Sequence, residues 1–413
     1  MRILHFSDLH IGVENYGRLD PDTGLSTRLG DFLGSLDEVV ACAIEEKIDL
    51  VLLAGDAYKG RDPSQTHQRE FAKRLSLLSN EGIPTFILVG NHDLPNAVSR
   101  ATAVDIFRTL QVPKLYIGDS LQTYLVPTPN GPLQILAVPW PRRGGILSRD
   151  ESRGLTIDEI RQELENRITL AIQDRVSQLD PGIPAILTGH LTVNGATVGT
   201  ERSMMLGQDH VLLASTLHQP QFEYVALGHI HKHQILRDDP PMIVYSGSLQ
   251  RVDFTEEADQ KGFCLIDLDP QAPQGQRLIN FEFRNVNARK FITIDVEITT
   301  GDPNPTNTVI NEIKTKNIDD AIVRIRILIP SELETHLRES EIRMSLENAH
   351  YIAAINKESE DNRRTRIDYD VAEGLQPNQA LRLYVHGKDY TDTRQQKLIS
   401  YGDEIINAEP TDS

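Results

Sequence analysis

Five apolar stretches of strand length end in the same kind of polar residue, and this recurrence constrains the fold more than any other feature of the chain. The stretches read HFSDLH, LLAGD, LVGNHD, LTGH and ALGHIH, and each closes on aspartate, asparagine or histidine. If these strands end at one edge of a sheet, their terminal side chains meet there. The residues at these ends are Asp8, His10, Asp56, Asn91, His92, Asp93, His190, His229 and His231.

Residues 1 to about 285 alternate strand-length apolar runs with segments of helical periodicity, a pattern that predicts layered α/β structure. Strands are expected at 2–6, 49–54, 84–89, 133–138, 184–188, 222–227 and 242–246, and helices at about 27–47, 64–81, 97–110 and 155–179. Four of the strands place a glycine just before the polar residue, where the missing Cβ permits close approach of the backbone. These glycines are Gly55, Gly90, Gly189 and Gly228.

The mixture of carboxylate, amide and imidazole donors indicates a metal site. Such donors suit Mn²⁺, Mg²⁺, Fe²⁺ or Zn²⁺, and the absence of thiolate argues against a structural zinc cage. The expected ligands are Asp8, His10, Asp56, Asn91, His190, His229 and His231. These seven ligands are too many for one ion. If one carboxylate bridges two ions, they provide four ligands to each ion. Each fragment alone is commonly a turn or a helix cap, so the prediction depends on all five occurring together.

The composition indicates a cytoplasmic protein, and no membrane segment is expected. No stretch approaches the roughly 20 apolar residues of a spanning helix. Only two cysteines occur, Cys42 and Cys264, and they match no disulfide or zinc framework. The formal net charge of −18 argues against a nucleic-acid partner. Two divalent ions beside Asp8 and Asp56 would nevertheless leave a locally positive pocket.

Two smaller regions follow the first. We expect an α+β capping domain at 286–372, because 290–298 and 321–329 are typical of strands and 301–307 of a turn before a helix. Arg324 and Arg326 fall on one face of the second strand, which predicts a half-buried strand. Residues 373–413 form a helical tail with two short apolar stripes, Leu381, Tyr384, Val385 and Leu398, Tyr401, Ile405.

The stretches SDLHIG, GDAYK, GNHD, TGH and GHIH resemble the five signature blocks of the calcineurin-like metallophosphoesterase superfamily. The chain is also similar to the SbcD-type nuclease subunits of that superfamily, which are related to the meiotic-recombination and double-strand-break-repair nucleases. This narrower likeness lies in DLHIG, RDPSQTHQREF (61–71) and YSGSLQRVDFTEEADQKGF (245–263). The resemblance implies layered sheets flanked by helices, followed by a DNA-binding capping domain and a tail.

The resemblance also implies roles for individual residues. One ion would be held by Asp8, His10, Asp56 and His231, and the other by Asp56, Asn91, His190 and His229. His92 would serve the leaving oxygen rather than a metal, with Asp93 orienting its ring. Lys59 stands where many relatives carry a second histidine, which puts the balance of exonuclease and endonuclease cutting in doubt, and it would contact phosphate together with Arg61.

The activity implied is a Mn²⁺-dependent DNA nuclease, with Mg²⁺ as the alternative ion, that cuts duplex ends exonucleolytically and single strands or hairpins endonucleolytically. It would process DNA ends in repair as a homodimer with an SMC-like ATPase of the SbcC type. Two alternatives stay open: a phosphodiesterase of nucleotides or other small phosphoesters, and a noncatalytic scaffold, although every block is filled. Basic residues that could follow DNA are Arg61, Arg69, Lys73, Arg74, Arg142, Arg143, Arg363, Arg364 and Arg366.

Overall fold

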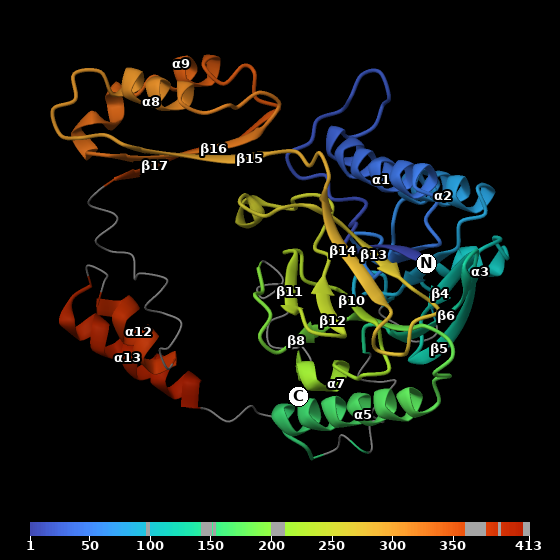
Figure 1. Ribbon diagram of the computed structural model, residues 1–413. Helices are drawn as coiled ribbons and strands as arrows, with labels where there is room; N and C mark the ends of the chain where they lie inside the picture. Colours follow the sequence, from blue (N-terminus) through green and yellow to red (C-terminus); the bar gives the residue numbers. More distant parts are fainter. Residues whose placement is uncertain are drawn as a thin grey trace. The chain divides into compact units, whose positions relative to one another are not determined.

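The protein is described by a computed structural model, which covers residues 1–95, 100–141, 151, 154–199, 211–359, 377–386 and 390–407. The chain forms two compact units, Met1–Phe291 and Ile292–Ser413 (Figure 1). The boundary between them falls a few residues after the one expected near residue 285.

The first sheet of the larger unit has six strands in the order β14-β13-β1-β2-β3-β4. Strands β1 to β4 are parallel, whereas β13 runs antiparallel to β1 and β14 antiparallel to β13. The strands are β1 (Arg2–Phe6), β2 (Leu50–Leu53), β3 (Thr85–Leu88), β4 (Leu115–Gly118), β13 (Gly262–Leu268) and β14 (Leu278–Asn285), and the helices between the parallel ones are α1 (Thr27–Glu45), α2 (Gln65–Asn80) and α3 (Asp105–Thr109).

The second sheet also has six strands, in the order β11-β12-β10-β7-β6-β5. Its four central strands are parallel and its two edge strands antiparallel. The elements are β5 (Gln122–Thr128), β6 (Gly131–Val138), β7 (Ala185–His190), β10 (Tyr224–Gly228), β11 (Gln234–Arg237) and β12 (Met242–Tyr245), with helices α5 (Ile157–Ser177) and α7 (Ala214–Leu217), the short pair β8 (Thr192–Val193) and β9 (Val211–Leu212), and the 3-10 turn η1 (Phe254–Glu256).

The two sheets pack face to face and are covered on their outer sides by helices, which confirms the predicted α/β layers. Residues of both sheets share one core, for example Leu52 of the first and Ile186 of the second. Helices α1 and α2 cover the first sheet, and α5 and α7 cover the second (Figure 1). Each fully buried Leu, Ile or Phe contributes roughly 1.5–3 kcal/mol relative to exposure, so this layering fixes the strand ends firmly.

One expected helix is shorter than the sequence suggested. Periodicity predicted a helix at 97–110, but α3 covers only Asp105–Thr109, and 96–99 lie outside the described residues. The Asp105 carboxylate accepts the backbone N–H of Thr102 (2.7 Å), so the chain makes a capped turn immediately before the helix.

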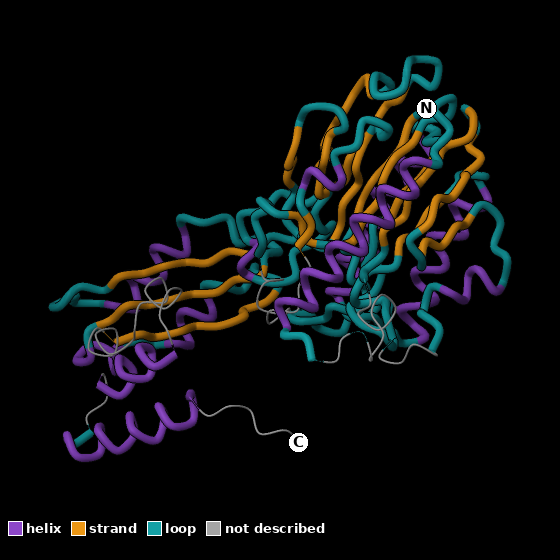
Figure 2. The backbone as a smooth tube through the Cα atoms, turned by 90° about the horizontal axis from the view of Figure 1, so that it is seen from below, coloured by secondary structure: helices purple, strands orange, loops and turns teal. Residues whose placement is uncertain are grey.

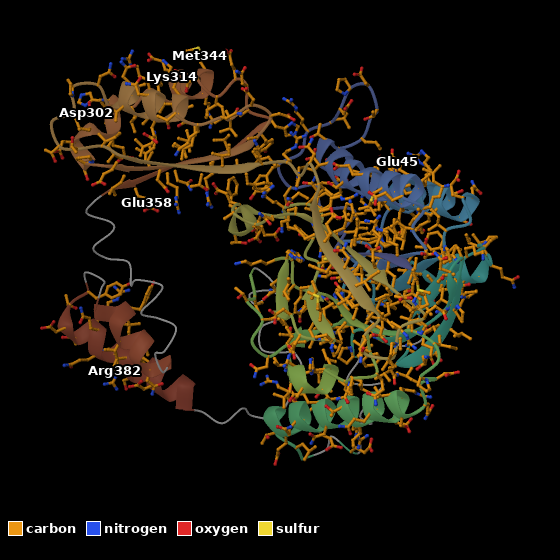
Figure 3. All side chains as sticks on the ribbon, viewed as in Figure 1. Glu45, Asp302, Lys314, Met344, Glu358 and Arg382 are labelled. Carbon is orange, nitrogen blue, oxygen red and sulfur yellow. The ribbon has the colours of Figure 1, made fainter. Side chains whose placement is uncertain are left out.

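The smaller unit contains a three-stranded sheet in the order β15-β16-β17, with three long strands side by side (Figure 2). Helices cover one face, so that Lys314 and Met344 lie on the helical side and Glu358 lies at the sheet (Figure 3). The expected strand carries Arg324 half-buried and Arg326 exposed. The elements are β15 (Phe291–Glu297), α8 (Pro305–Lys314), β16 (Ile322–Ile329), η2 (Ser331–His336), α9 (Glu339–Met344) and β17 (Tyr351–Ser359).

The tail forms two helices, α12 (Pro377–His386) and α13 (Asp392–Asn407), which pack on each other. Leu381 lies against Gly402, and Val385 is buried. Tyr384, Leu398 and Tyr401 are exposed. No helix in the described part of the chain has the length and apolar character that a membrane span requires.

Candidate metal centre

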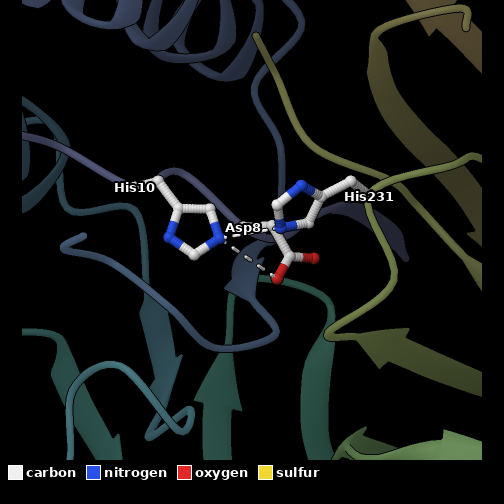
Figure 4. A group of neighbouring side chains, drawn as sticks. All are labelled: Asp8, His10 and His231. Atoms are coloured by element: carbon white, nitrogen blue, oxygen red, sulfur yellow. Dashed lines mark hydrogen bonds and ion pairs between the residues drawn. The ribbon is translucent and has the colours of Figure 1, made fainter. Parts of the chain in front are cut away.

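The polar residues predicted from the five strand ends converge in the structure. They follow β1, β2 and β3 of the first sheet and β10 of the second, and His190 is the last residue of β7. Asp56 Oδ2 lies 3.2 Å from His190 Nε2 and 3.8 Å from His10 Nε2. His10 Nε2 lies 2.9 Å from His231 Nε2 and 3.9 Å from Asp8 Oδ1 (Figure 4). Carboxylates and imidazoles from both sheets therefore face one small, buried volume.

Several residues of this cluster have strained backbone. Asp8, His10 and Asp56 have φ values of 52°, 47° and 56°, and His229 has a φ of 94°. Residues other than glycine rarely adopt positive φ, and histidine at 94° lies outside the usual left-handed region. Strained residues of this kind gather at functional sites, where the surrounding packing holds them. These backbone conformations occur directly after β1, β2 and β10, where the ligand side chains leave the strands.

Two glycines make room for this convergence. A Cβ at Gly55, whose φ is 100°, would lie 2.1 Å from His190 Nδ1. A Cβ at Gly90 would lie 2.1 Å from Asp56 Oδ1. The close approach predicted at these positions is therefore present, and a side chain at either one would displace an expected ligand.

Hydrogen bonds outside the cluster orient the histidine rings. His190 Nδ1 lies 2.8 Å from the carbonyl oxygen of Ala54, and His92 Nδ1 lies 2.7 Å from that of Lys59. A carbonyl oxygen only accepts, so each Nδ1 must carry hydrogen and donate it. The Nε2 atoms of both rings consequently face the carboxylates. Ligand histidines in proteins are held in the same way.

His231 is held by a buried carboxylate that the sequence reasoning missed. Its Nδ1 lies 2.7 Å from Glu256 Oε1, and Glu256 Oε2 lies 2.7 Å from the fully buried Nζ of Lys261. Lys261 also donates to the backbone carbonyl of His231 (3.0 Å). Glu256 and Lys261 belong to the stretch 245–263, which carried the family likeness without an assigned chemistry. That stretch therefore holds one histidine of the cluster in place through hydrogen bonds.

The charge balance of the cluster fits bound cations. Burial lowers the pKa of His190, but the Asp56 carboxylate outweighs burial and raises that pKa to about 9. His190 Nε2 lies 3.2 Å from Asp56 Oδ2 and 3.0 Å from the Oδ1 of Asn91. Burial also holds the pKa of His10 well below its usual range. Oxygen atoms and ring nitrogens thus converge on one position, and this donor set fits two divalent ions.

Asp93 lies in a different position from the one expected. Its buried carboxylate accepts backbone N–H groups of Asp56 (3.0 Å), Gly90 (3.0 Å) and Tyr58 (3.3 Å). The expectation that Asp93 orients the His92 ring is wrong in this geometry, since Lys59 provides the partner of Nδ1. Asp93 instead fastens together the two loops that follow β2 and β3.

His92 lies at the rim of the cluster. Its Nε2 is 4.0 Å from Asp56 Oδ2, and its side chain is 31% exposed, whereas those of His10 and His190 are 4% and 0% exposed. His10, Asp56 and His92 come close enough to hold an ion together, so distance alone does not separate His92 from the expected ligands. Its exposure places it where a substrate can reach it.

The basic residues near the site differ in how they are engaged. Lys59 and Arg61 are exposed on the loop after β2. Arg69, Lys73 and Arg74 of α2 instead form ion pairs with Glu70, and Arg74 pairs with Asp37 as well. These three cations are occupied within the protein, which argues against the predicted DNA contacts there. The other predicted positions, Arg142, Arg143, Arg363, Arg364 and Arg366, lie outside the described residues.

Trp140 is a second neighbour that sequence reasoning missed. It follows β6, which lies beside β7 in the second sheet, and its ring centroid is 4.9 Å from that of His229 and 6.3 Å from that of His190. An indole is not among the side chains that mark a metal site in a sequence. Its position after a parallel strand of the same sheet was the available signal.

Comparison with known proteins agrees with this geometry. The family model described as Calcineurin-like phosphoesterase matches residues 1–233. Two relatives are each named as the SbcD subunit of nuclease SbcCD. The one from Bacillus subtilis (strain 168) is 28% identical over 274 residues, 65% of this chain and 67% of the relative. The one from Rhodobacter capsulatus is 29% identical over 287 residues, 65% of this chain and 66% of the relative.

The matches span about two thirds of each relative, and they confirm the resemblance to SbcD-type subunits. Among solved structures, TT1561 of Thermus thermophilus aligns over 69% of this chain and 98% of its own, with 15% identity and a TM-score of 0.34, too weak a likeness to argue from. The family match and the donor cluster confirm the predicted metal-dependent phosphodiesterase. Since the matched region contains all five strand ends that build the cluster, the chain belongs to the calcineurin-like phosphoesterase family.

Proposed function

We propose that the protein is a DNA nuclease that hydrolyses phosphodiesters at this centre. The observation that carries the proposal is the convergence of two carboxylates and several imidazoles from both sheets, in a chain similar to two proteins named as nuclease subunits. One ion would be held by Asp8, His10, Asp56 and His231, and the other by Asp56, Asn91, His190 and His229. Mn²⁺ suits this mixed oxygen and nitrogen set, and Mg²⁺ is the alternative.

The residues of the chain would divide the work around a phosphate. Two bound divalent ions supply positive charge to the phosphate oxygens and lower the pKa of the attacking water. His92, with Nδ1 fixed by the Lys59 carbonyl, would deliver a proton from Nε2 to the leaving oxygen. Asp93 would keep Asp56 in place through its backbone. The exposed side chains of Lys59 and Arg61 would contact the flanking phosphates.

A second candidate is a phosphodiesterase of nucleotides or other small phosphoesters. The family match fits this reading equally well, because the same centre would bind any phosphodiester. The length of chain after the matched region favours the larger DNA substrate, since the capping unit and the tail are not needed to build the centre.

The tail supports the proposal of a protein partner. Tyr384 of the first apolar stripe and Tyr401 of the second are 56% and 66% exposed. Exposed apolar side chains on a two-helix hairpin fit a groove on another protein, which we take to be an SMC-like ATPase of the SbcC type. Exposed Leu77 of α2, with Ile106 and Leu110 at α3, likewise supports a homodimer formed through these helices.

A cleavage assay tests the proposed function. Labelled hairpin and blunt duplex DNA would be incubated with Mn²⁺ or Mg²⁺, with and without the ATPase, beside a nucleotide phosphodiester as competitor. We expect Mn²⁺-dependent cutting of DNA. Cleavage of the small diester alone would favour the second candidate.

Deletion of residues 376–413 tests the partner. It should abolish co-purification with the ATPase and leave basal cleavage of single strands intact. Full binding by the truncated chain would place the partner elsewhere.

A further inference from the structure

A cavity of about 700 Å³ lies beside the metal centre and shares a wall with it. Trp140 belongs to that wall: it lines the cavity, and its ring also contacts the ring of His229. Leu94, which follows directly after the Asn-His-Asp block, lines the cavity as well. A group bound on the cavity side of Trp140 is therefore the immediate neighbour of a group bound at the metal ligands. The volume falls in the range of pockets that take small molecules.

The described charges of the lining are largely engaged within the protein, which favours an uncharged group over a phosphate. Arg100, Arg167, Asp105 and Asp119 line the cavity, and Arg108 pairs with both aspartates (3.7 and 2.8 Å). Arg167 is tied to Glu163 (2.8 Å) and Glu151 (3.0 Å). The adjoining metal centre is the better site for the anion. An indole in the wall of this cavity suits a flat aromatic ligand, because aromatic rings prefer stacked or edge contacts.

We propose that this cavity seats the nucleobase next to the scissile phosphate, with the base against Trp140. The inference rests on the proposed nuclease function and adds to it a site for the base. Stacking on an aromatic side chain tolerates every base, so the site would hold a nucleotide without selecting a sequence. It would also require the base to leave its duplex partner, which single strands and hairpin loops permit at least cost.

Fluorescence provides a direct test, because Trp140 is the only tryptophan in the chain. The full-length protein with Mg²⁺ is titrated with thymidine 5′-monophosphate and, as a matched control, with deoxyribose 5-phosphate, which lacks the base. We expect the nucleotide to quench Trp140 emission and the sugar phosphate to leave it unchanged. Equal quenching by both ligands, or none by the nucleotide, would overturn the base site.

Cleavage kinetics provide the second arm. The wild-type protein should cut an oligonucleotide about tenfold faster than the same strand with an abasic site beside the scissile phosphate, given the usual strength of base stacking. Trp140→Leu should lose this preference, and Trp140→Phe, which keeps a ring and guards against simple misfolding, should retain most of it. An unchanged preference in Trp140→Leu would refute the assignment.

The two arms separate this inference from the function on which it rests. If DNA is cut but the nucleotide does not quench, the nuclease stands and the base site falls. If the nucleotide quenches Trp140 and DNA is not cut, the base site stands and the substrate is a smaller nucleotide diester.

Discussion

The metal centre and the charged face of helix α2 are two clusters of ionisable side chains in one domain, and their charges are balanced in different ways. We call the α2 group the closed cluster, because its carboxylates and cations pair with one another. There, Arg69, Lys73 and Arg74 of α2 pair with Glu70 of the same helix, and Arg74 also pairs with Asp37 of α1. In the metal centre, carboxylates, an amide oxygen and imidazole Nε2 atoms converge on one buried volume.

These two clusters show what distinguishes a binding site from a stabilising ion-pair network. Side-chain charge and burial occur in both clusters, since Glu70 is as buried as His231. What differs is whether the protein supplies the complementary charge itself. A cluster that satisfies its own charges contributes to stability and binds nothing further, whereas one left with excess acceptors requires a cation from outside.

The largest effect is expected from Asp56→Asn, which would test the excess of acceptors directly. The substitution keeps a side-chain oxygen that accepts the backbone N–H of His92 (2.9 Å in the wild type). It removes the negative charge shared by both expected ions. Activity should fall about a thousandfold or more, because metal ions supply several kcal/mol of transition-state stabilisation. Calorimetric unfolding with and without Mn²⁺ should show that metal no longer raises the melting temperature.

Asp37→Asn is the matched control for this experiment, because Asp37 belongs to the closed cluster and pairs with Arg74. It should leave both cleavage and the metal-induced stabilisation unchanged. If Asp56→Asn keeps two bound metals and full activity, the two clusters do not differ in the way that we describe.

His92→Ala should produce the next effect. If His92 serves the leaving oxygen and holds no ion, turnover should fall by about two to four orders of magnitude while bound metal stays near the wild-type amount. Metal content by elemental analysis and single-turnover cleavage measure the two quantities. His67→Ala, which removes a histidine paired with Glu14 on the surface, is the control. Lost metal in His92→Ala would assign that ring to the ligands.

Glu256→Gln tests the support behind the centre. The amide cannot hold the Nδ1 proton of His231 as a carboxylate does, so metal affinity should fall about 10- to 100-fold. Titration calorimetry with Mn²⁺ measures this, and Glu257→Gln controls for a carboxylate one residue away. Because the substitution also removes the negative charge 2.7 Å from the buried ammonium of Lys261, Glu256→Gln combined with Lys261→Met should recover stability but not affinity. Recovered affinity in that pair would show that Glu256 acts only on the fold.

Much of the layered fold could be predicted from sequence because parallel strands buried on both faces are continuous apolar runs. Strands β1, β2, β3, β6, β7, β10 and β12 all lie within the stretches expected, to within one or two residues. The antiparallel pair β13 and β14 was not predicted as part of the first sheet. Strand β14 is mostly half-exposed, so its apolar signal is diluted, and its pairing depends on residues far away in the sequence.

The centre could be predicted as a set of residue types but not as a geometry. Strand ends are visible in sequence, and the side chains predicted there do meet. The positive φ of His229 is not visible, because no residue type announces it. Glu256 acts through a hydrogen bond to His231 that forms only after the chain folds. Likewise, α2 displays its cations in sequence without showing that Glu70 and Asp37 bind them.

The smallest effect is expected from Glu70→Gln, and it tests the closed cluster. Hydrogen bonding by Lys73 lowers the pKa of Glu70 to about 2, with Arg69 and Arg74 adding to this against the opposing effect of burial. A carboxyl whose folded-state pKa lies below its unfolded value of about 4.3 stabilises the fold above that value, and the contribution is lost as pH falls toward 2. Lys73 is 60% exposed, so solvent screening keeps the expected loss to about 1–2 kcal/mol at neutral pH. Denaturant unfolding of the wild type and of Glu70→Gln should show this difference in the free energy of unfolding at pH 7. The difference should disappear between about pH 4 and pH 2. DNA cleavage should be unchanged, since the α2 cations are already engaged. A difference that persists at pH 2, or a changed KM for DNA, would show that this cluster is not closed.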